Sequence, residues 1–177
     1  RAHILESRKL GAARLTAQFV KSDPISNEDR KALQKHFEKE LGPLFADIHK
    51  HKPVRIIGTS GTLENIAEMC GDGIEDADDD GLVGAIDRNK FSKLLDKVTA
   101  ADRTERGKMR GLDDQRKDQI VAGALLVNEV FDRMNARQIQ ICPAALREGI
   151  LLDYLARHMP DLAIRREVPD PRRRSVI

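Results

Sequence analysis

The run Arg55-Ile56-Ile57-Gly58-Thr59-Ser60-Gly61-Thr62 is the stretch that most constrains how this chain can fold. Apolar residues lead into a turn with glycine on both sides of Thr59-Ser60, and residues 63–69 continue at helical spacing. The order strand, tight turn, helix leaves backbone N–H groups at the helix N-terminus free to bind an anion. The run lacks the lysine of a Walker A motif and the third glycine of a dinucleotide fingerprint. The pattern alone therefore fits a phosphate-binding loop or an ordinary turn capped by Thr or Ser.

The composition is that of one folded domain with nearly balanced charge. A chain of 177 residues can bury one core, and 40% of its residues are hydrophobic. Thirty-one basic and 29 acidic side chains give a net charge of +2 at pH 7. That balance argues against a general nucleic-acid or membrane-binding surface, so we expect neither partner.

Cysteine usage bears on the cellular compartment. Cys70 and Cys142 lie far apart beside apolar runs, which favours reduced thiols over a disulfide. No stretch approaches the roughly 18 apolar residues of a membrane span, and no signal peptide is recognisable. We expect a cytoplasmic protein.

The hydrophobic pattern along the chain predicts an α/β fold. We expect strands at 3–5, 54–57 and 138–142. We expect helices at 12–20, 30–51, 63–69, 91–97, 113–134 and 150–158, and a partly helical segment at 100–109. A start signature at 23–29 precedes the long helix, Gly42-Pro43 is expected to kink or split it, and Gly123-Ala124 indicates close helix packing. Three strands make a thin sheet, which suggests that pairing partners lie outside this chain.

An acidic loop at 76–87 fits a calcium-binding template. Asp76, Asp78 and Asp80 occupy positions 1, 3 and 5, glycine occupies position 6, and Asp87 occupies position 12. Asp87 stands where a bidentate Glu is the rule, and no clear pair of amphipathic helices flanks the loop. The alternative is a solvated acidic surface loop.

Arg147 and Glu148 form a second candidate site next to Gly149 at a helix start. The guanidinium could bind a phosphate, or it could make a surface salt bridge with Glu148. A nucleophilic serine is not indicated, because Ser60 is not part of a Gly-x-Ser-x-Gly motif. The five histidines show no metal-ligand spacing.

Two motifs together resemble the exopolyphosphatase / guanosine pentaphosphate phosphohydrolase (Ppx/GppA phosphatase) family. They are Gly58-Thr59-Ser60-Gly61-Thr62 with Ile66-Ala67, and Ala145-Leu146-Arg147-Glu148-Gly149-Ile150-Leu151. Residues 9–15 and 119–124 are similar to other landmarks of that family in the same order. Residues 172–176 resemble the junction before its helical C-terminal region. The resemblance extends from Ser7 to about Ile177.

The resemblance implies an actin-like ATPase fold, which has two ribonuclease-H-like lobes and a ligand cleft between them. This chain matches the second lobe only, as residues 1–160, followed by an Arg/Pro-rich linker at 161–177 toward a missing C-terminal region. The family's Gly-rich phosphate loop, its first-lobe loop and its catalytic Glu have no counterpart before Ser7. We therefore expect a fragment that lacks its first strands and is inactive alone.

The resemblance also implies the ligand and its contacts. Gly58, Thr59, Ser60, Gly61, Thr62 and Arg147 would bind phosphate, whereas Glu148 would orient Arg147 or cap a helix. The parent enzyme would use Mg²⁺ to hydrolyse a terminal phosphoanhydride of polyphosphate or guanosine pentaphosphate, with a carboxylate supplied from outside this chain. The implied partners are that ligand and the missing first lobe. Unpaired strand edges could also support a homodimer.

Two other functions remain open at the level of sequence. One is a non-catalytic phosphate-ligand sensor or interaction module on the same fold. The other is a structural domain tuned by Ca²⁺ at the 76–87 loop.

Overall fold

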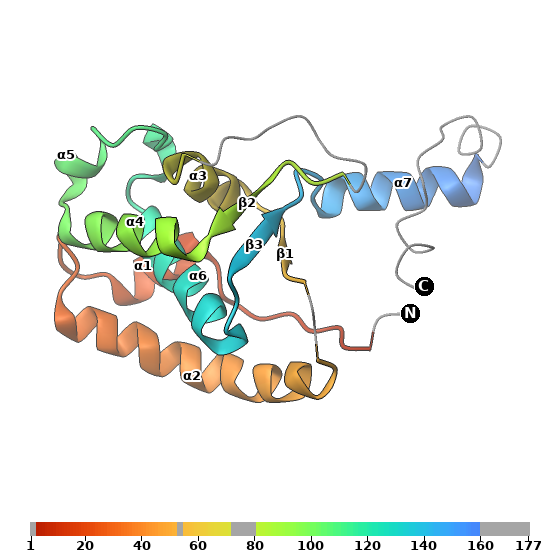
Figure 1. Ribbon diagram of the computed structural model, residues 1–177, viewed down its shortest axis with the longest axis horizontal. Helices are drawn as coiled ribbons and strands as arrows, with labels where there is room; N and C mark the ends of the chain where they lie inside the picture. The colour runs from red at the N-terminus through yellow and green to blue at the C-terminus, as the bar shows by residue number, and fades with distance from the viewer. Residues whose placement is uncertain (1–2, 53–54, 72–80, 160–177) are drawn as a thin grey trace.

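The structure, a computed structural model, describes residues 3–52, 55–71 and 81–159 and is an α/β arrangement of helices around a small sheet (Figure 1). In chain order, the elements are α1 (Ala12–Phe19), α2 (Asn27–Lys50), β1 (Ile57–Gly58), α3 (Gly61–Met69), β2 (Gly84–Asp87), α4 (Arg88–Ala100), α5 (Arg103–Arg106), the 3-10 helix η1 (Asp114–Arg116), α6 (Ile120–Met134), β3 (Gln138–Ile141) and α7 (Leu146–His158).

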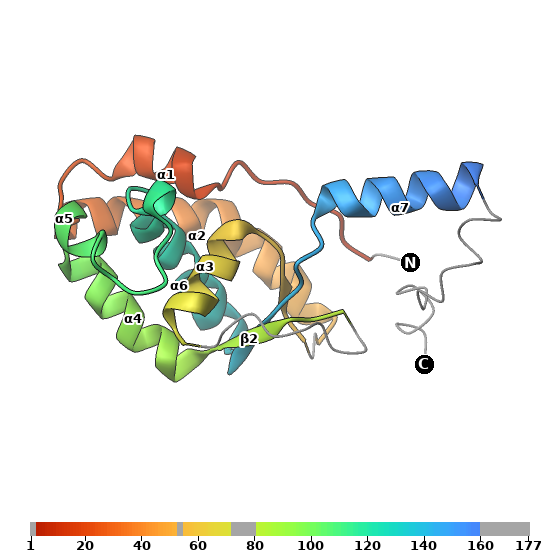
Figure 2. The same ribbon diagram turned by 90° about the horizontal axis from the view of Figure 1, so that it is seen from above.

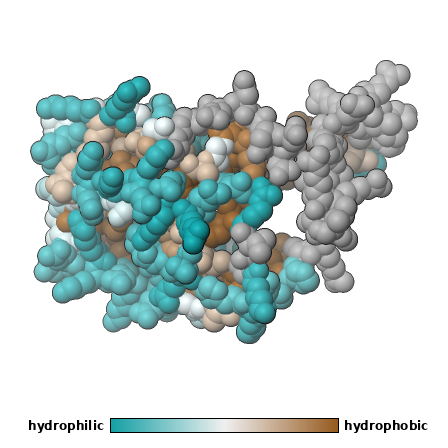
Figure 3. Space-filling model, in the orientation of Figure 1, coloured by the Kyte–Doolittle hydropathy of each residue, from teal (hydrophilic) through white to brown (hydrophobic). Residues whose placement is uncertain are grey.

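The sheet has three strands in the order β1-β3-β2. β1 runs parallel to β3, with Gly58 opposite Ile141, and β2 runs antiparallel to β3. In the described part of the chain, β1 pairs only with β3, and Ile57 is 50% exposed. Apolar surface is visible over the strands, whereas the surrounding helices present mainly hydrophilic side chains (Figure 3). None of the described strands therefore pairs with the outer edge of β1.

The core lies between the sheet and the helices. α6 packs against α1, α2 and α4, and α3 packs against β2, β3 and α6. Phe91 of α4 and Phe131 of α6 are fully buried, with ring centroids 5.1 Å apart. Both rings belong to one continuous cluster that also contains Leu15, Ile86 and Ile141.

α7 differs from the other long helices because it extends away from the body of the molecule (Figures 1 and 2). None of its residues is buried. Its large exposed apolar side chains are Leu146, Ile150, Leu151, Leu152 and Tyr154. Within the described residues, no helix combines the length and the apolar character needed to cross a membrane.

The helical predictions are largely confirmed. α1, α2, α3 and α4 fall where periodicity and capping signals placed them, and the Ser26 side chain accepts a hydrogen bond from the Asp29 N–H at the start of α2. α2 is not split at Pro43, because its buried stripe continues on both sides through Phe37, Leu41 and Phe45. The segment 113–134 is two helices, η1 and α6, and α7 begins earlier than predicted, at Leu146. No disulfide joins Cys70 and Cys142, and both residues are half-buried.

One strand prediction is wrong, and one strand was not predicted. Residues 3–5 form no strand: Leu5 is 87% exposed, and the described residues offer this segment no backbone partner in the sheet. Residues 84–87, assigned to the acidic loop, form β2, because they find an antiparallel partner in β3. The predicted strand at 54–57 is shorter, and β1 begins at Ile57.

Candidate phosphate site

The loop between β1 and α3 begins the candidate site. Ser60 caps α3: its side-chain Oγ accepts a hydrogen bond from the Leu63 N–H at 3.2 Å, and its backbone carbonyl accepts one from the Glu64 N–H at 3.0 Å. The N–H groups of Gly61 and Thr62 donate no hydrogen bond to any residue that the structure describes. They are the free donors of a helix N-terminus, where the helix dipole also favours an anion.

Arg116 of η1 lies over this loop. Its Nη1 is 3.5 Å from Thr62 Oγ1, and its guanidinium fills the space that a Cβ atom on Gly61 would occupy. Arg116 Nε is also 3.6 Å from an Asp113 carboxylate oxygen. Glycine at position 61 is therefore required for the guanidinium to lie this close to the loop. The Arg116 cation thus lies at the same loop as the free N–H groups.

Two hydrogen-bond networks hold the segment that carries Arg116. The buried Asn65 side chain donates to the Gly111 carbonyl and accepts from the Asp113 N–H at 3.3 Å. The Arg106 side chain, 4% exposed, donates to the carbonyls of Ala101 and Lys117 at 2.6 and 2.9 Å. The Asn65 bonds connect the segment 101–117 to α3, and the Arg106 bonds hold the two ends of this segment together.

Gly123 of α6 sets the position of the loop from the other side. A Cβ atom at Gly123 would lie 2.7 Å from Thr62 Cγ2 and 3.3 Å from the Cβ of Ala12. The close packing predicted at this glycine is confirmed, and it fixes Thr62 against α6.

Arg147 lies at the same edge of the sheet. The Cys142 N–H donates to the Gly58 carbonyl at 3.0 Å, so the chain leaves β3 beside the loop and then enters α7. Carboxyl ends of adjacent parallel strands form the ligand-binding edge of many α/β sheets. The Arg147 side chain is 90% exposed, and its Nη2 is 3.4 Å from Glu148 Oε1. It makes no hydrogen bond with the loop residues that the structure describes.

Glu148 caps α7. Its Oε2 accepts a hydrogen bond from the Ala145 N–H at 2.9 Å. Hydrogen bonds from its own N–H and from that of Ala145 hold the pKa of this carboxyl below its ordinary value, and the charge of Arg147 adds to the effect. The capping role predicted for Glu148 is confirmed.

Only one of the four proposed calcium ligands falls within the described residues. Asp76, Asp78 and Asp80 lie outside them. Asp87 ends β2 and caps α4, where its Oδ1 accepts hydrogen bonds from the N–H groups of Asn89 and Lys90 at 2.8 and 3.1 Å. Among the described residues, no group of three His, Cys, Asp or Glu side chains could hold a metal ion. Calcium binding at 76–87 stays a prediction.

Arg116 is the site residue that the sequence did not indicate. It lies 54 positions after Thr62, in a segment rich in both charges. Gly61 at the start of α3 was the one available signal, since a glycine there can admit a neighbouring side chain.

Comparison with solved structures shows that the fold is that of the actin-like ATPase-fold proteins. An exopolyphosphatase from Cytophaga hutchinsonii superposes with a TM-score of 0.74 at 26% identity, covering 85% of this chain and 49% of that one. The Ppx/GppA family member of Aquifex aeolicus gives a TM-score of 0.69 at 24% identity, covering 84% and 47%. The chain belongs to the Ppx/GppA phosphatase family, whose model matches residues 1–158.

Two curated relatives match most of this chain. An uncharacterized protein of Streptomyces coelicolor is 32% identical over 84% of this chain and 45% of its own length. Exopolyphosphatase 1 of Mycobacterium leprae is 29% identical over 84% of this chain and 44% of its own length. The chain thus spans less than half the length of these relatives.

Proposed function

We propose that this chain is the phosphate-binding second lobe of a hydrolase that releases terminal phosphate from inorganic polyphosphate or guanosine pentaphosphate. One observation carries the proposal: the free N–H groups of Gly61 and Thr62 and the Arg116 guanidinium meet at one loop. Preorganised donors and a cation of this kind stabilise phosphoryl oxygens most as negative charge builds up in phosphoryl transfer.

Each residue would contribute by binding or orienting the phosphate chain. The backbone of Gly58–Thr62 and the hydroxyls of Thr59 and Ser60 would contact phosphate oxygens. Arg147, exposed at the same edge, would contact the phosphate chain after a side-chain rotation, or it would contact the other lobe. The water-activating carboxylate would come from the part of the relatives that this chain does not cover, so the chain would be inactive alone.

The accessible surfaces support such a second half. β1 has one described neighbour in the sheet, and α7 exposes Leu146, Ile150 and Leu151. We propose that further strands pair with β1 and that the other lobe packs near α7.

Mg²⁺ would be the cofactor. Since the described residues offer no carboxylate cluster for it, the ion would be held by the phosphate chain and by groups elsewhere. We propose a cytoplasmic location for the protein. Residues 161–177 stay a predicted linker.

The test is phosphate release from polyphosphate and from guanosine pentaphosphate in the presence of Mg²⁺. The 177-residue chain would be compared with a chain extended by its own upstream sequence. We expect release by the extended chain only, reduced about tenfold or more by Arg147→Ala. Turnover by the 177-residue chain would contradict the proposed inactivity. No release by either chain would contradict the hydrolase and favour a non-catalytic phosphate sensor.

A further inference from the structure

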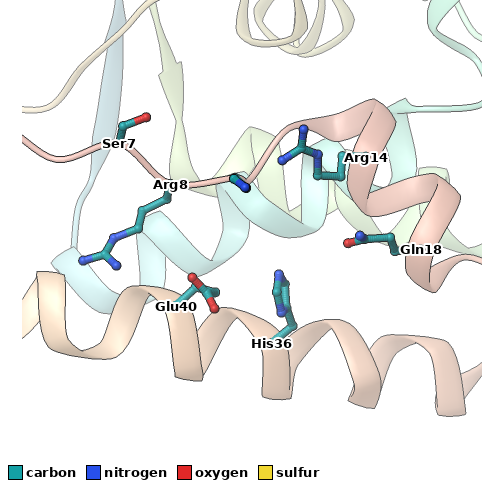
Figure 4. A pocket seen from close by; sticks show the side chains of 7 residues that line it. Ser7, Arg8, Arg14, Gln18, His36 and Glu40 are labelled. Carbon is teal, nitrogen blue, oxygen red and sulfur yellow. The ribbon is translucent and has the colours of Figure 1, made fainter.

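A pocket of about 600 Å³ lies between the segment 7–9, α1 and α2 (Figure 4). His36 and Glu40 point from α2 toward Arg14 and Gln18 of α1. Lys9 lines the pocket from the N-terminal segment. Polar groups from three separate segments therefore converge on a space large enough for a small organic molecule.

Three of the charged side chains in this pocket have no partner among the described residues, and Lys9 and Arg14 are exposed. Neither Lys9, Arg14 nor Glu40 has an ion-pair or hydrogen-bond partner among the described residues. Arg8 also lines the pocket, but its Nη2 pairs with Glu6 at 3.1 Å. The pocket thus offers two unpaired cations and one unpaired carboxylate, which are complementary to an anion that also carries hydrogen-bond donors.

His36 is held in place for such a contact. Its ring packs on Phe19, with the centroids 4.8 Å apart, and it is half-buried. Gln18, one helical turn from Arg14, adds an amide that can both donate and accept. A bare oxyanion would leave the Glu40 carboxylate facing a like charge, whereas hydroxyl or amino groups would satisfy it.

This pocket is separate from the phosphate loop. Ala12 of α1 faces Gly123 and, through it, Thr62. Arg14 and Gln18 lie roughly 200° and 240° around the helix from Ala12, at about 100° per residue. The two sites are therefore on opposite faces of α1.

We propose that this pocket binds a phosphorylated organic molecule of nucleotide size. Its phosphate group would lie on Arg14 and Lys9, and its hydroxyl or amino donors would lie on Glu40. The proposal goes beyond the hydrolase function, since it concerns a different face of the lobe, and it does not depend on that function.

Calorimetric titration of the full chain with AMP and with sulfate tests this proposal. Sulfate carries negative charge but no hydrogen-bond donor. We expect AMP to bind more tightly than sulfate, and Arg14→Gln to weaken AMP binding about tenfold or more. Glu40→Gln should reduce the preference for AMP over sulfate by about tenfold, because it removes the charged acceptor and the repulsion together.

Two control variants show whether AMP binding is specific to this pocket. Lys39→Gln removes a charge from an exposed position of the same helix and should leave AMP binding unchanged. Gln34→Ala changes another exposed position of α2 outside the pocket lining and should also leave it unchanged. The proposal would be overturned by the absence of AMP binding, by equal losses in Arg14→Gln and Lys39→Gln, or by sulfate binding as tightly as AMP.

Discussion

The methyl group of Thr62 lies 2.7 Å from the point that a Cβ atom on Gly123 would occupy. This contact joins the start of α3, where the free N–H groups are, to the buried helix α6. The loop is therefore positioned by core packing, and changes in the core should alter phosphate binding.

Gly123→Ala should destabilise the protein by about 1–3 kcal/mol, because the added methyl group would clash with Thr62 and meet Ala12 at 3.3 Å. Urea unfolding measures the change. Thr62→Ser removes the opposing methyl group and should restore much of the loss in the double variant. Gly149→Ala is the matched control: it is also in a helix, its Cβ would meet nothing within 4 Å, and it should be neutral or stabilising.

Arg116→Gln should weaken the binding of tripolyphosphate about tenfold or more, because it removes the cation that lies over Gly61 and Thr62. Gly61→Ala should have a similar effect by displacing the same guanidinium, at little cost in stability, since the displaced group ends a flexible side chain.

Calorimetry on the two single variants and their combination gives a double-mutant cycle. The combined loss should be close to either single loss. Arg110→Gln removes an exposed charge from the same segment and should bind normally. Fully additive losses would show that Gly61 and Arg116 act independently.

Arg106→Lys should lower the free energy of unfolding by about 2–4 kcal/mol. A lysine keeps the charge but cannot reproduce the planar set of bonds to Ala101, Lys117 and Asp23. Binding of tripolyphosphate should also weaken, because these bonds hold the segment that carries Arg116. Arg103→Lys, at an arginine that is 60% exposed, should change stability by no more than about 0.5 kcal/mol. Equal stability of the two variants would disprove the structural role of Arg106.

Asp29→Asn should destabilise the protein by about 1–3 kcal/mol at pH 7, and the difference should shrink in acid. Burial alone raises the pKa of Asp29, but hydrogen bonds from Lys21, Ser22 and Ser26 outweigh it and lower the pKa below the ordinary 3.8. The unfolded chain therefore binds the proton more tightly. The charged Asp29 carboxylate therefore contributes its full stabilisation at pH values above 3.8. This contribution is lost as the pH falls through the lower pKa that Asp29 has in the folded protein.

Urea unfolding of both proteins at pH 7 and at several pH values below 3.8 measures this dependence. Asp47→Asn is the control, because Asp47 is on the same helix, is half exposed and pairs only with Lys50 among the described residues. A loss in Asp29→Asn that is constant across this pH range would contradict the account.

Much of this fold could be predicted because its signals are local. Ser26 and Ser60 cap helices where the sequence places them, and the periodicity of α6 and α2 reflects faces that are in fact buried. The turn at Gly58–Thr62 and the packing at Gly123 are likewise encoded in short stretches.

The rest depends on partners distant in the sequence. β2 exists only because Ala85 and Ile86 pair with β3, more than fifty residues later, and an acidic, Gly-rich neighbourhood gave no sign of this. The segment 3–5 has strand-forming residues but no described neighbour, so composition alone misled. Arg116 reaches the loop through the Asn65 and Arg106 networks, which no local pattern reveals.

The most direct test of the phosphate loop is a nuclear magnetic resonance titration of the chain with tripolyphosphate, following the backbone amides of Gly61 and Thr62. We predict that these two resonances shift saturably and that the shifts are lost in Arg116→Gln. Unchanged Gly61 and Thr62 resonances at saturating tripolyphosphate would contradict the assignment of this loop as the phosphate site.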